Sequence, residues 1–128
     1  MKVLEFAFDS LGPSDDQPHR YSRDSVCYTG THDNCPLSQW LEEATPERVA
    51  FAKQYMGLNG EEGPIWGMIR SGMSSVSDLF VAQMQDYLEL GAESRMNFPG
   101  TLSNKNWTWR AQSDMITSAL AHRIREIT

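Results

Sequence analysis

The chain has 128 residues, 40% of them hydrophobic and 22% charged, a size and composition that fit one globular domain. Its 11 basic and 17 acidic residues give a net charge of −6 without a basic cluster, which argues against nucleic acid or an anionic membrane as a partner. No apolar run reaches about 18 residues and no signal-peptide layout is present, so the sequence predicts neither a membrane span nor a secretion signal.

The first half of the chain predicts two strands and then two helices. Val3–Phe8 alternates apolar and mixed residues and predicts a strand, whereas the polar, proline-containing residues 9–24 predict a long loop. Ser25–Thr29 predicts a second, buried strand. Residues 36–43 fit a short helix, and Thr45–Gly57 begins with a hydroxyl N-cap before proline and continues at helical spacing.

The second half predicts a helix, a third strand and a final helix. Pro64–Met73 has one broad apolar face, Leu79–Met84 is a short apolar run, and Ser113–Ile127 again shows helical spacing. The glycine-, proline- and asparagine-rich residues 95–109 predict a loop. Strands that alternate with helices indicate a parallel sheet, so the fold class is α/β. Three strands cannot close a barrel and would leave two sheet edges unpaired.

The most informative stretch follows the second predicted strand, where His32 and Asp33 are adjacent. In a parallel α/β barrel the loops after the strands build the active-site face. A carboxylate there can bind sugar hydroxyls and stabilise an oxocarbenium-like transition state. The pattern also fits a helix N-cap by Asp33 with His32 facing solvent, and spacing alone favours this second interpretation.

The two cysteines, Cys27 and Cys35, have no disulfide framework and predict free thiols in a reduced, cytoplasmic protein. His19 and His122 show no metal-ligand spacing with the acidic residues, so we expect no metal. The sequence contains no glycine-rich phosphate loop and no serine or cysteine nucleophile motif.

Short motifs follow one another in a fixed order across nearly the whole chain. They are Val3–Asp9 (VLEFAFD), Pro18–Tyr21 (PHRY), Tyr28–Asn34 (YTGTHDN), Trp40 with Ala44–Glu47, Gln85–Thr101, and Asn106–Arg110 (NWTWR). In this order they resemble the 4-α-glucanotransferases of glycoside hydrolase family 77, which are also called amylomaltases or disproportionating enzymes. Each motif alone is modest, but the ordered set is highly specific.

The resemblance implies that residues 1–128 are the C-terminal part of a catalytic (β/α)8 TIM barrel, about strands six to eight with their helices. It implies a retaining double displacement that transfers segments of α-1,4-glucan between malto-oligosaccharides without a cofactor. The nucleophile and the acid/base glutamate fall in family segments that would precede Met1. We therefore expect a fragment of the enzyme that is inactive by itself.

The resemblance also assigns site residues. Asp33 matches the third carboxylate, which stabilises the transition state, and is the one catalytic residue expected here. His32, Asn97 and Phe6 match positions that bind substrate. Cys35 departs from the family, which usually has an aspartate there, and this leaves the start of the next helix uncertain. For Asp86 and Glu93 the family gives no catalytic role, and we favour a structural one.

Two alternatives stay open at the level of sequence. The tryptophans Trp107 and Trp109 could form a sugar platform, although packing of the last helix against the barrel is the favoured interpretation. The chain could also be a non-catalytic glucan-binding protein or a self-assembling part-barrel. Whether the chain is a fragment of the enzyme or a self-assembling part-barrel, its open sheet edges would be covered, by the N-terminal half of a barrel or by a second copy.

Overall fold

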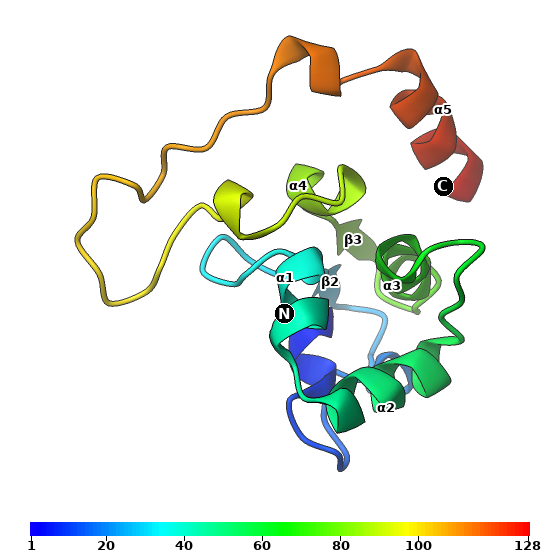
Figure 1. Ribbon diagram of the computed structural model, residues 1–128. Coiled ribbons are helices and arrows are strands. Elements are labelled where there is room, and N and C mark those ends of the chain that lie inside the picture. The colour runs from blue at the N-terminus through cyan, green and yellow to red at the C-terminus, as the bar shows by residue number, and fades with distance from the viewer.

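The computed structural model describes residues 1–128 and contains a three-stranded parallel sheet in the order β1-β2-β3, with helices beside it (Figure 1). β1 (Lys2–Val3) pairs with β2 (Val26–Tyr28), and β2 pairs with β3 (Leu79–Val81). The predicted parallel α/β arrangement is therefore confirmed. None of the helices is long and apolar enough to cross a membrane.

The helical elements lie mostly where the sequence predicts them. α2 begins after Thr45, whose hydroxyl accepts the Arg48 N–H, and ends at Gly57 with a left-handed φ of 65°. In chain order the helical elements are η1 (Leu4–Phe8), η2 (Pro18–Arg20), α1 (Leu37–Glu43), α2 (Pro46–Met56), α3 (Pro64–Met73), α4 (Met84–Tyr87), η3 (Ala92–Ser94), η4 (Ser113–Met115) and α5 (Ser118–Ile127).

The prediction of one strand over Val3–Phe8 is wrong. Only Lys2–Val3 is extended, and Leu4–Phe8 forms the 3-10 helix η1. Leu4, Ala7 and Phe8 are fully buried, and their spacing of three and four residues places them on one face of a helical turn. Strict alternation would have sent Leu4 and Phe8 to the opposite face from Ala7, so core packing selects the helical conformation.

Two other predicted elements are too long. The strand predicted over Leu79–Met84 ends at Val81, and Met84 instead begins α4. The helix predicted over Ser113–Ile127 is divided into η4 and α5. Here Thr117 is the N-cap, because its hydroxyl accepts the Leu120 N–H at 3.1 Å and so fixes the helix start.

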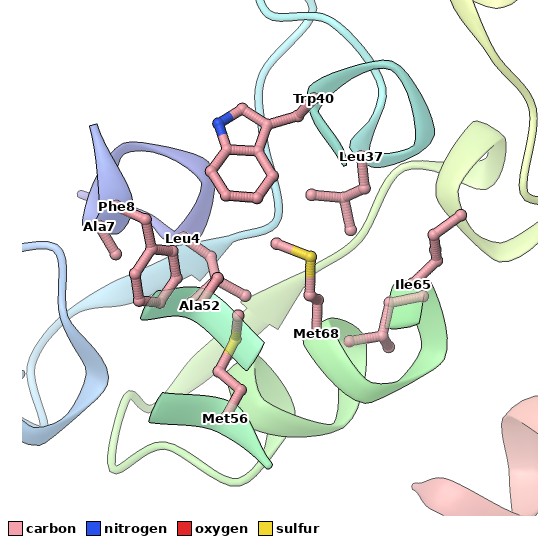
Figure 2. Close-up of a cluster of buried hydrophobic side chains, with 10 residues drawn as sticks. Leu4, Ala7, Phe8, Leu37, Trp40, Ala52, Met56, Ile65 and Met68 are labelled. Atoms are coloured by element: carbon pink, nitrogen blue, oxygen red, sulfur yellow. The ribbon is translucent and has the colours of Figure 1, made fainter. Parts of the chain in front are cut away.

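The core lies between η1, α1, α2 and α3, as Figure 2 shows. The Phe8 ring is fully buried and packs among aromatic rings, with ring centroids 5.6 Å from both Phe51 and Tyr55 and 6.2 Å from Trp40. The buried cluster consists of Leu4, Ala7, Phe8, Leu37, Trp40, Ala52, Met56, Ile65, Met68 and Ile69.

The helices cover only one face of the sheet. Cys27 and Phe80 are register partners, and on this face Cys27 is buried while Phe80 packs against the core. Leu79 and Val81 alternate to the other face, where they are 55% and 38% exposed. This open apolar face is most exposed at β3, because Val3, which lies in register with Tyr28 and Val81 on the same face, is buried.

Candidate functional site

The loop after β2 is shaped by its own side chains. Asn34 Oδ1 accepts both the backbone N–H and the hydroxyl of Thr31, at 2.8 and 2.9 Å. The Thr31 hydroxyl in turn accepts the Asp33 N–H at 3.2 Å. These bonds close a tight turn that holds Asp33 at the carboxyl end of the parallel sheet.

Asp33 is not a helix N-cap, so this part of the interpretation favoured by spacing alone is wrong, although the His32 side chain is exposed, at 56%, as that interpretation expects. α1 begins only at Leu37, and Pro36 occupies the N-cap position without a side-chain cap. The intervening Cys35 and Pro36 separate the Asp33 turn from the helix. The Asp33 side chain is therefore left half-exposed, at 47%, and is available for other interactions.

A second segment, distant in sequence, holds Asp33 in place. Asn97 Nδ2 donates to Asp33 Oδ1 at 2.7 Å, and Arg95 Nη2 donates to the Asp33 carbonyl oxygen at 2.8 Å. Arg95 Nε also donates to the Asn97 carbonyl at 3.0 Å. One carboxylate oxygen is thus fixed, and Asp33 Oδ2 forms no hydrogen bond within the chain.

His32 lies between Asp33 and an aromatic side chain. His32 Nε2 is 3.4 Å from Asp33 Oδ1, and the His32 ring centroid is 4.9 Å from that of Trp107, at an interplanar angle of 43°. Trp107 is 57% exposed within this chain. Packing of the last helix against a complete barrel, the favoured interpretation of this residue, stays a prediction. Sequence reasoning also missed Arg95, for which the only signal was its place two residues before Asn97.

Three of the four site residues expected from sequence therefore come together: His32, Asp33 and Asn97. Phe6 lies in η1 after β1, at the same end of the sheet, and is 41% exposed. Its ring pairs with no other aromatic ring in the structure. Phe6 thus lies at the same end of the sheet as the site, but no aromatic contact joins it to His32 or Trp107.

Glu5 supports the loop from its buried side. The Cys35 thiol donates to Glu5 Oε1 at 3.0 Å, whereas Oε2 is buried without a partner. A Cβ at Gly30 would be only 2.8 Å from Oε2, so a larger residue there would require the Glu5 side chain to move. Burial raises the pKa of Glu5 to about 8, and burial also raises the pKa of Cys35 to about 12. Both groups are therefore mostly neutral at pH 7.

Asp86 ties the loop to two helices. It is 2% exposed and accepts the Leu37 N–H at 2.8 Å and the Thr29 hydroxyl at 2.7 Å. Burial raises the pKa of Asp86, although these two hydrogen bonds oppose the shift. The exposed Glu93 accepts the Gly91 N–H at 3.0 Å. These contacts fit the structural roles expected for both acids.

Two hollows differ in the chemistry that they could support. One of about 330 Å³ adjoins the open sheet face and is lined by Tyr28, Thr31, His32 and Val81, among others. A larger one of about 470 Å³ lies between α2 and α3, and neither hollow has a carboxylate in its lining. No group of three or more His, Cys, Asp or Glu side chains is arranged to hold a metal ion. Only the smaller hollow includes His32, whose ring lies 3.4 Å from the Asp33 carboxylate, so it is the hollow beside the candidate site.

Comparisons with known proteins agree with one another. The model of glycoside hydrolase family 77, described as 4-alpha-glucanotransferase, matches residues 1–117. The 4-alpha-glucanotransferase of Clostridium butyricum is 42% identical over 100% of the chain, and that of Thermus thermophilus is 41% identical over 98%. The structure of an amylomaltase from Streptococcus agalactiae in complex with acarbose matches with a TM-score of 0.94 and 36% identity, over 99% of the chain. The chain spans only 26% of the length of each of these three proteins.

Proposed function

Because the chain belongs to glycoside hydrolase family 77, the 4-alpha-glucanotransferases, we propose that it contributes part of the active site of such an enzyme. The complete enzyme would transfer segments of α-1,4-glucan between malto-oligosaccharides. The observation that carries this proposal is the hydrogen bond of 2.7 Å from Asn97 to Asp33, which joins two segments at the carboxyl ends of the parallel strands. The amylomaltase complex with acarbose supports a glucan-like ligand.

In this proposal Asp33 is the transition-state-stabilising carboxylate. Asn97 fixes one of its oxygens, which leaves Oδ2 free to accept hydrogen bonds from sugar hydroxyls. The negative charge of Asp33 would also stabilise the positive charge that develops at the anomeric carbon. His32 would bind the same sugar, and the exposed ring of Phe6 would contact its neighbour and exclude water.

The retaining reaction needs two further carboxyl groups, about 5–5.5 Å apart. We propose that the nucleophile and the acid/base come from the part of the enzyme that this chain does not match. Residues 1–128 would then form about strands six to eight of a (β/α)8 catalytic domain, with the open face of the sheet turned toward the barrel interior. The free thiols of Cys27 and Cys35 fit a cytoplasmic enzyme.

The test begins with glucose release from maltotriose by the 128-residue chain alone, for which we expect none. A hybrid in which this chain replaces the matching 26% of the Clostridium butyricum relative should be active. Asp33→Asn in the hybrid should lower transfer about a thousandfold, which corresponds to about 4 kcal/mol of transition-state stabilisation.

The matched control is Asp78→Asn, because Asp78 is exposed and contacts only Arg23, at 3.9 Å. This variant should retain the activity of the hybrid, and both variants should keep the parent circular dichroism spectrum. Near-normal turnover by the Asp33→Asn hybrid would rule out the proposed role. Glucose release by the isolated chain would mean that another of its carboxylates is the nucleophile.

A further inference from the structure

We propose that the indole face of Trp107 is a sugar-stacking surface, which binds the pyranose ring next to the one that Asp33 contacts and so favours longer glucans. This inference rests on the proposed function, because it takes an α-1,4-glucan as the ligand. It deepens that function by naming a residue that determines glucan length.

The first support is the position of the ring. Trp107 contacts His32, which in turn lies 3.4 Å from the Asp33 carboxylate. A broad apolar ring that stands one side chain away from a sugar-binding carboxylate is placed to contact an adjoining sugar. The apolar face of an indole suits the C–H face of a pyranose, and its N–H can donate a hydrogen bond at the rim.

The second support is that the ring is open to solvent. Trp40 and Trp66 are 7% and 3% exposed, and the Arg123 guanidinium also covers the Trp66 ring at 3.9 Å. Trp107, in contrast, is 57% exposed. Within residues 1–128 most of its ring is therefore free to contact a ligand, whereas the buried tryptophans serve packing.

The third support is the backbone of Trp107. Its φ of 62° is left-handed, which is uncommon for a bulky residue and is maintained only when surrounding contacts impose it. The contacts are present: the Trp107 N–H donates to the Met96 carbonyl at 2.5 Å, and Asn106 Oδ1 accepts the Phe98 N–H at 3.2 Å. These bonds lie on either side of Asn97, so one segment positions both the Asp33 partner and the indole.

The test is a titration of the 128-residue chain, followed by NMR. The Trp107 indole N–H resonance is assigned from its loss in Trp107→Phe. Maltoheptaose should shift this resonance together with the backbone amides of His32, Asp33 and Asn97, while the Trp40 and Trp66 resonances stay unchanged. Cellopentaose, whose glucose units are β-linked, is the control ligand and should shift none of them.

Variants separate stacking from a structural role. Trp107→Ala should weaken maltoheptaose binding about tenfold but leave the binding of glucose, which has no adjoining ring, and the amide positions of residues 31–34 unchanged. Trp107→Phe should retain most of the affinity, and Trp109→Phe should have no effect. Equal losses for both sugars, or displaced loop amides, would show that Trp107 only supports His32.

The outcomes also separate this inference from the function on which it rests. Shifts of the His32 and Asp33 amides without a shift at Trp107 would overturn the stacking surface but leave the glucan site in place. Shifts at none of these residues with maltoheptaose would also overturn the stacking surface, whereas the activity of the hybrid decides the proposed function separately.

Discussion

Glu5 is a buried carboxyl that lies against the loop presenting Asp33. Its Oε1 accepts the Cys35 thiol, two residues beyond Asp33, and its Oε2 adjoins Gly30, three residues before it. A charged carboxylate here would be buried with only one thiol donor, which is why burial dominates the rise of its pKa to about 8. The loop therefore packs against a carboxyl group that is mostly protonated at pH 7.

We predict that the chain loses stability between about pH 4.5 and pH 8. The folded chain holds the Glu5 proton more tightly than the unfolded chain, whose carboxyl titrates near 4.5. The stabilisation is thus complete below pH 4.5 and is lost as the pH rises through about 8, by a few kcal/mol. The measurement is the melting temperature by circular dichroism at pH 5 and at pH 8.5.

Glu5→Gln is the matched variant, because its amide remains neutral and can still accept the Cys35 thiol. Burial also raises the pKa of Asp9 and of Asp86, so these two groups also lower the stability of the folded chain as the pH rises. The variant should therefore reduce the pH dependence without abolishing it. Parallel pH curves for the variant and the parent chain would contradict the assignment to Glu5.

At the residue scale, the sequence predicts which residues form the site better than it predicts the contacts between them. The motif around Tyr28–Asn34 indicates Asp33 and His32, and the resemblance adds Asn97. The bond between Asn97 and Asp33 spans 64 positions, and no local pattern predicts a pairing over that separation. The same holds for the contact of Trp107 with His32, because the left-handed backbone that permits it is rarely adopted by tryptophan.

At the element scale, α3 approaches the sheet closely because of a single glycine. Gly72 lies on α3 against the ring of Phe80 in β3, and a Cβ at this position would overlap that ring. Phe80 in turn packs against the buried core. The distance between helix and strand is therefore set by the absence of a side chain at residue 72.

We predict that Gly72→Ala destabilises the chain by about 1–3 kcal/mol, since the interior tolerates added volume poorly. The measurement is the free energy of unfolding in urea. Gly60→Ala is the control, because a Cβ there would meet nothing within 4 Å and its φ is not left-handed. Phe80→Leu should restore part of the loss in the double variant. A Gly72→Ala chain as stable as the Gly60→Ala chain would contradict this account.

The predicted elements differ in accuracy for physical reasons. α2 and α3 are predicted well, because a hydroxyl cap, prolines at the helix starts and apolar faces agree with one another. The run Val3–Phe8 is short and apolar, and such runs fit a strand or a buried helical turn equally well. Its conformation is decided by packing of Leu4 and Phe8 in the core, which depends on α1 and α2 and is not encoded locally.

At the scale of the whole molecule, the sheet is open in two ways. β1 and β3 are its edge strands, and each has one side without a strand partner. The face opposite the helices exposes Leu79 and Val81. Unpaired edges and an exposed apolar face are features that proteins normally cover, and they promote association between chains.

We therefore predict that the 128-residue chain associates with itself in solution. Its average mass, measured by light scattering during size-exclusion chromatography, should rise with concentration above the monomer mass of 14.5 kDa. Leu79→Lys should lower the mass toward that of the monomer, because it places a charge on the open face.

Val76→Lys is the matched control, since Val76 is equally exposed, at 55%, but lies outside the sheet. A parent chain that stays monomeric at all concentrations and melts cooperatively would contradict the prediction. An even-numbered oligomer of defined mass that binds maltoheptaose without turnover would instead favour a self-assembling, non-catalytic part-barrel, because the chains would then close the sheet edges for one another.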